Sequence, residues 1–155
     1  MSFKITGLDG NHFSQLYGLT DDKLKSQGVV RLSIDEYPSY PDRITLRDIP
    51  VGETALLLNH TFIDTDSPYK GSHAIFIWEG QLNPSVYLDI IPEVVERRIM
   101  SLRGYDKQDM LIEANIAQPG EARDQILTLL MNDRIEFILA HHARQGCFSC
   151  RIERN

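Results

Sequence analysis

Hydrophobic and polar residues alternate in several short runs of this chain, a pattern typical of strands with one buried face. Two of the runs, residues 54–60 and 73–78, are almost wholly apolar and are bounded by glycines, so we expect them in the centre of a sheet. We predict a sheet of six or seven strands. The candidate runs are residues 3–8, 29–34, 54–60, 73–78, 99–105, 110–117, 135–140 and 147–153.

About three segments have the helical period instead, at residues 13–17, 20–28 and 121–131. In the second, Thr20 is a good N-cap residue and Gly28 provides the left-handed conformation that ends many helices. The third is the best amphipathic helix, since its apolar residues recur every three or four positions.

The remaining stretches are irregular or ambiguous. Prolines at 38 and 41 disrupt regular structure in residues 37–41, and Pro84 and Pro92 leave residues 83–97 without a clear prediction. No repeat or linker divides the chain. We therefore predict one α+β domain over residues 1–155, with a mostly antiparallel sheet.

Charge and composition exclude several classes of protein. The formal net charge of -6 would repel a phosphate backbone, so we expect no nucleic-acid partner. Arg97, Arg98 and Arg103 come nearest to a basic patch, which we interpret as a solvated sheet face. The start has no apolar signal core and no run is long enough to span a membrane, so we predict a cytoplasmic protein with no membrane contact.

The segment 141–151 is chemically the densest part of the chain, with two histidines, two cysteines and two arginines. Two imidazoles and two thiolates would match the donors that zinc prefers. However, successive side chains of a strand point to opposite faces, which separates His141 from His142 and Cys147 from Cys150. We assign no metal ligand and no cofactor.

The length of the turn decides which of these side chains meet. A two-residue turn at Gln145 and Gly146 places His142 opposite Ser149, whereas a four-residue turn places it opposite Cys147. In the second arrangement an imidazole would favour the nucleophilic thiolate, which makes His142 and Cys147 candidate catalytic residues. Alternatively, the cysteines are small buried residues and the histidines cap a strand end.

A second candidate site is the loop that enters the run 73–78. It carries a cation, a hydroxyl group and an imidazole that could bind a phosphate or carboxylate together with Arg144. It is not a P-loop, because the glycine-lysine pattern is absent. The candidate ligand-binding residues are Tyr69, Lys70, Ser72, His73 and Arg144.

Four blocks of the chain, in the same order, are similar to one bacterial family, the domain-of-unknown-function family 1203. The blocks are residues 1–8, 67–76, 101–106 and 142–147. The resemblance implies a single domain and supplies no activity, substrate or cofactor. In that family the segment corresponding to residues 41–43 often has a cysteine where this chain has Asp42, so a cysteine-based site would lack one donor here.

Three functional hypotheses follow. The first is a protein that binds, or transforms, a small anionic metabolite in a pocket between residues 69–73 and 142–147. The second is a non-catalytic interaction module or homodimer that pairs through a sheet edge. The third is a small zinc-binding protein. The sequence leaves open whether the protein is an enzyme and whether it is a monomer or a homodimer.

Overall fold

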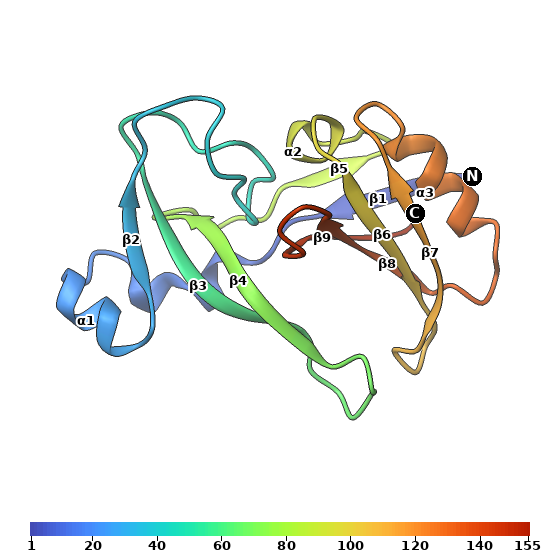
Figure 1. Cartoon of the computed structure of the whole chain (residues 1–155), viewed down its shortest axis with the longest axis horizontal. Coiled ribbons are helices and arrows are strands. Elements are labelled where there is room, and N and C mark those ends of the chain that lie inside the picture. Colours follow the sequence, from blue (N-terminus) through green and yellow to red (C-terminus); the bar gives the residue numbers. More distant parts are fainter.

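The computed structural model describes all 155 residues and arranges nine strands in two antiparallel sheets (Figure 1). The larger sheet consists of β1 (Phe3–Thr6), β5 (Val86–Leu88), β6 (Met100–Tyr105), β7 (Leu111–Ala117), β8 (Phe137–His142) and β9 (Phe148–Arg154), in the order β5-β1-β9-β8-β6-β7. The smaller sheet consists of β2 (Val30–Ser33), β3 (Thr54–Ile63) and β4 (Gly71–Trp78), in the order β2-β3-β4.

The helices are short. They are α1 (Asp21–Ser26), α2 (Glu93–Glu96) and α3 (Ala122–Leu130), with two 3-10 turns, η1 (Gly10–His12) and η2 (Ser14–Leu16). The Thr20 side chain accepts a hydrogen bond from the backbone N–H of Lys23 at 3.3 Å, and Gly28 follows α1 with a φ of 74°. None of these helices has the length and apolar character needed to cross a bilayer.

The larger sheet is buried on both faces by different partners. On one face, Ile126 and Leu129 of α3 pack against strand residues such as Ile138 and Ile152, all without solvent exposure. On the other face, residues of β8 and β9 pack against the smaller sheet. That second core includes Phe137, Leu139 and Phe148 from the larger sheet and Leu56, Leu58, Ile75 and Ile77 from the smaller one.

The segment between β2 and β3, residues 34–53, leaves the smaller sheet, contacts the larger sheet at Phe148 and returns, and we call it the crossing loop. It buries three charged residues, Asp42, Arg43 and Asp48, which are each at most 3% exposed. Asp42 accepts hydrogen bonds from the backbone N–H of Thr45 at 2.6 Å and of Trp78 at 2.8 Å. Burial of these charges is tolerable only because each finds polar partners.

The α+β class is confirmed, and most predicted elements are present within one or two residues of their expected ends. The nine strands are the eight candidate runs and the short strand β5, which lies with α2 in the ambiguous residues 83–97, and the larger sheet has six strands. The expectation that residues 54–60 and 73–78 are both central is wrong for β4, which is an edge strand. Its apolar residues are buried because they pack face to face against the larger sheet.

We predict that Gly7→Ala is strongly destabilising. A Cβ at this position would lie 2.0 Å from the carbonyl oxygen of Ile44, so the crossing loop would have to move away from β1. We expect the free energy of unfolding, measured with urea, to fall by about 3 kcal/mol.

Gly28→Ala is the matched control, since its Cβ would meet nothing within 4 Å and only the positive φ opposes it. That change should cost about 1 kcal/mol. Equal losses for the two variants would contradict the importance of the close approach at Gly7.

Candidate functional site

The turn between β8 and β9 has four residues, 143–146, which decides between the two registers predicted from the sequence. The backbone N–H of His142 donates to the carbonyl of Cys147 at 2.9 Å, and the N–H of Gly146 donates to the carbonyl of His142 at 2.7 Å. Gly146 adopts a φ of 81°, which suits a residue without a side chain. His142 and Cys147 are therefore direct neighbours across the hairpin.

The two adjacent histidines point to opposite faces, as strand alternation predicts. The ring of His141 lies in the core between the sheets, with its centroid 4.8 Å from that of Phe62. His142 lies on the other side and lines a cavity. Both are buried, at 0% and 3% exposure, yet Nε2 of His141 and both ring nitrogens of His142 have no hydrogen-bond partner.

The cavity beside His142 has a volume of about 500 Å³, and we call it the arginine cavity. Three of its residues are arginines and none is acidic. The lining residues come from the segment that follows α2, the connection from β7 to α3, and the end of β8 with the β8–β9 turn. The lining residues are Arg97, Arg98, Ile99, Gln118, Pro119, His142, Arg144 and Gln145.

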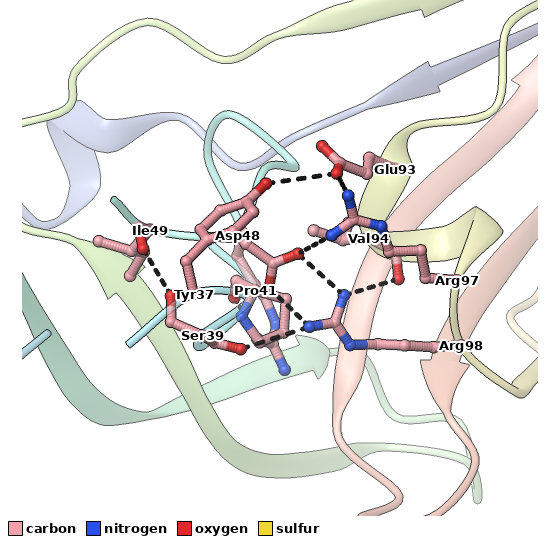
Figure 2. A network of polar contacts seen from close by, with 10 residues as sticks. Tyr37, Ser39, Pro41, Asp48, Ile49, Glu93, Val94, Arg97 and Arg98 are labelled. Carbon is pink, nitrogen blue, oxygen red and sulfur yellow. Dashed lines mark hydrogen bonds and ion pairs between the residues drawn. The ribbon is translucent and has the colours of Figure 1, made fainter. Parts of the chain in front are cut away.

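Two of the arginines are held from behind by one buried carboxylate. Figure 2 shows the guanidinium groups of Arg97 and Arg98 converging on Asp48 of the crossing loop. Arg98 contacts Asp48 at 2.6 Å and Arg97 at 3.5 Å, and the Asp48 side chain is completely buried. Arg97 also pairs with Glu93, one turn earlier along the chain. These contacts fix the two guanidinium groups at the wall of the cavity.

The third arginine, Arg144, forms no ion pair and no side-chain hydrogen bond with any of the other residues, all of which the structure describes. It lies at the exposed tip of the β8–β9 turn. Its positive charge is therefore available to a ligand.

A fourth arginine, Arg43, is buried behind the hairpin. Its Nε donates to the carbonyl of Phe148 at 2.7 Å, its Nη1 to the carbonyl of Pro41 at 2.5 Å, and its Nη2 to Sγ of Cys147 at 3.1 Å. Burial lowers the pKa of Arg43, but a guanidinium remains protonated at neutral pH. The positive charge therefore lies directly against the β8–β9 hairpin.

This environment keeps both adjacent histidines neutral. Burial, with the charges of Arg43 and Arg98, lowers the pKa of His142 to about 2. Burial, with the charge of Arg103, lowers the pKa of His141 to about 4. At neutral pH each imidazole thus has one N–H donor and one acceptor nitrogen.

The other predicted ligand-binding residues lie elsewhere. Lys70 is exposed and pairs with Asp64 at 3.0 Å, and the ring of Tyr69 contacts that of Tyr105 at the end of β6. His142 pairs with Met100 at the opposite end of β6.

A six-residue strand therefore separates Tyr69 and Lys70 from Arg144, a span of about 17 Å. Ser72 and His73 lie on β4, opposite Thr61 and His60 of β3. The structure thus does not bring residues 69–73 and Arg144 into one pocket.

The interpretation of Arg97 and Arg98 as part of a solvated sheet face is wrong. Both residues follow α2, and the Arg98 side chain is only 26% exposed beside Asp48. The two consecutive arginines were the available signal. Nothing in the local sequence indicates that they approach Arg144 or a carboxylate 50 residues earlier.

The four histidine and cysteine side chains of the hairpin do not assemble as zinc ligands. Among the 155 described residues there is no group of three or more His, Cys, Asp or Glu side chains arranged to hold a metal ion. Cys147 and Cys150 are free thiols, both buried.

Comparison with known proteins identifies one family. The family model described as "Protein of unknown function (DUF1203)" matches residues 39–154, which include most of the crossing loop, the arginine cavity and the β8–β9 hairpin. No curated protein and no solved structure matches the chain.

We predict that the protein loses stability as the pH falls below about 6.5. His141 and His142 have lowered pKa values in the folded state, so the unfolded chain binds protons there that the native state does not. The loss is about 1.4 kcal/mol per pH unit for each histidine, or about 4 kcal/mol for both at pH 5. Urea unfolding at pH 8, 6.5 and 5 measures it.

Glu79 contributes little to the loss between pH 6.5 and 5. Arg31 lowers the pKa of this carboxylate to about 2, so the stability that it contributes is lost only at lower pH. His142→Phe keeps a buried ring and removes one titrating group, so the slope between pH 6.5 and 5 should fall by about half. A wild-type stability that is equal at pH 8 and pH 5 would contradict the burial of neutral imidazoles.

Proposed function

Because the chain belongs to the DUF1203 family, whose function is unknown, we propose from its geometry that it binds a small anionic molecule in the arginine cavity. The observation that supports this most is the lining of that cavity, with three arginines and no acidic residue. Phosphate and carboxylate groups are the ligands that guanidinium groups recognise best.

The cavity is cationic although the protein is acidic. With 22 acidic and 16 basic residues, the chain has a formal net charge of -6, and random placement would surround a cavity with both signs. A concave surface lined by one sign of charge concentrates the field and attracts oppositely charged small molecules. The local charge therefore favours an anion.

Preorganisation supports the same proposal. Arg97 and Arg98 are oriented by Asp48, so they need not be ordered when a ligand binds. Arg144 has no competing partner and supplies a charge that is not already neutralised. The buried imidazole of His142 adds a polar group that lacks a partner in the free protein.

The lining also indicates the character of the ligand. Ile99 is the one hydrophobic residue, and the cavity has no Phe, Tyr or Trp ring on which a nucleobase could stack. Gln118 and Gln145 provide amides that suit hydroxyl or carbonyl groups. We therefore expect a compact, polar metabolite with one or more phosphate or carboxylate groups.

We predict that Arg144→Gln weakens anion binding by about 10-fold or more, because a charge-assisted hydrogen bond contributes about 1.5 to 3 kcal/mol. The measurement is thermal unfolding with inorganic phosphate, citrate or a hexose phosphate, each against chloride of equal ionic strength. A ligand at 100 times its Kd should stabilise the wild type by about 2.7 kcal/mol.

Arg134→Gln is the matched control, since it removes the same charge at an exposed position outside the arginine cavity. Its ligand-induced shift should equal that of the wild type. The proposal fails if no anion shifts the wild type, or if both variants lose the shift equally.

A second candidate function is pairing with another copy of the chain through β5. This strand is an edge of the larger sheet, and Val86, Leu88 and Ile90 beside it are 53%, 52% and 61% exposed. An edge strand with exposed apolar residues is a template for strand addition. A homodimer formed in this way would be independent of anions.

For this candidate we predict a dimer in analytical ultracentrifugation that Leu88→Lys converts to a monomer, because the lysine would have to be buried without a partner in the pairing. Ile116→Lys is the control, as Ile116 is 53% exposed on β7, the opposite edge of the same sheet. A wild-type monomer at every concentration would exclude pairing through β5.

A further inference from the structure

The buried guanidinium of Arg43 has an unusual set of partners. Three of its nitrogens donate to the carbonyls of Pro41 and Phe148 and to the sulfur of Cys147. Arginine has donors only, so the sulfur at 3.1 Å must accept this hydrogen bond. A thiolate accepts far more strongly than a thiol, and the contact therefore favours the ionised sulfur.

No carboxylate forms a hydrogen bond with this guanidinium. Arg43 is 1% exposed, and a buried charge requires a partner of opposite sign nearby. The charge of Asp42 acts on Arg43 from nearby, but the Asp42 oxygens bind Thr45 and the backbone N–H of Trp78. Among the groups that touch the guanidinium, Cys147 is the one that can become an anion.

The surroundings of Cys147 contain a second unexplained feature. His142 lies directly opposite it across the hairpin, and opposed residues of an antiparallel pair share a face. The His142 imidazole is 3% exposed and neither ring nitrogen has a partner, which is costly in a folded protein unless another molecule satisfies them. The same turn contributes Arg144 and Gln145 to the arginine cavity.

From these contacts we propose that Cys147 is a reactive thiolate and a site of oxidation by hydroperoxides. The sulfur attacks one peroxide oxygen, the S–O bond forms as the O–O bond breaks, and the second oxygen leaves with the bonding electrons as hydroxide or alkoxide. The sulfur loses two electrons and the peroxide gains two, which yields a sulfenic acid. This role does not depend on anion binding in the arginine cavity.

Cys150 is an internal control in the same molecule. It has no solvent exposure, whereas Cys147 keeps 8% of its surface exposed. Burial raises the pKa of the Cys150 thiol to about 12, so it remains protonated and unreactive at neutral pH. The two cysteines are distinguished by peptide mapping after labelling.

The test is the rate of iodoacetamide labelling of native protein at pH 8 and pH 6, followed by mass spectrometry. The rate for an ordinary thiol falls about 75-fold over this interval, because its thiolate fraction falls with pH. We expect Cys147 labelling to change by less than about 3-fold and Cys150 to stay unlabelled. Treatment with hydrogen peroxide and dimedone should tag Cys147 alone.

Arg43→Met should restore the ordinary 75-fold dependence of Cys147 labelling, and Cys150→Ser should leave the wild-type behaviour unchanged. The wild-type measurement stands even if Arg43→Met does not fold. The proposal is overturned if the rate of Cys147 labelling in the wild type falls about 75-fold from pH 8 to pH 6, or if both cysteines are labelled at equal rates. It is also overturned if dimedone does not label Cys147 after treatment with hydrogen peroxide.

Discussion

The buried guanidinium of Arg43 joins the two sheets of this protein. Arg43 belongs to the crossing loop of the smaller sheet, and it donates to the carbonyl of Phe148 at the start of β9 in the larger one. Leaving a buried charge or carbonyl without a partner costs more free energy than the hydrogen bond itself contributes. The crossing loop and the β8–β9 hairpin therefore adopt their positions together. The apolar residues between the sheets give this junction its stability but not its exact geometry.

The same loop shapes the arginine cavity through Asp48. Five residues after Arg43, this carboxylate is buried against Arg97 and Arg98, which follow α2 on the other side of the junction. One loop therefore supports two sides of the cavity. Arg43 binds the β8–β9 hairpin, and Asp48 binds Arg97 and Arg98. These two roles explain why buried charged residues occur in a segment that otherwise lacks regular structure.

Buried polar atoms without partners are concentrated in the β8–β9 hairpin, in His141, His142 and Ser149. A folded protein usually satisfies such atoms, and exceptions tend to mark functional positions. The hairpin divides these groups between two environments, since His141 faces the core between the sheets and His142 faces the arginine cavity. This division supports a functional role for the cavity face and a packing role for the other.

The sequence alone determined the α+β class, the caps of α1 and the alternation that separates His141 from His142, because these depend on neighbours within a few residues. It also narrowed the hairpin to two registers. Only the tertiary structure shows that the turn has four residues and that the strands form two sheets. It also shows that Tyr69 and Lys70 lie at the end of β6 away from Arg144. It alone brought Asp48, Arg98 and Arg144 together, because contacts between residues about 50 positions apart leave no local pattern in the sequence.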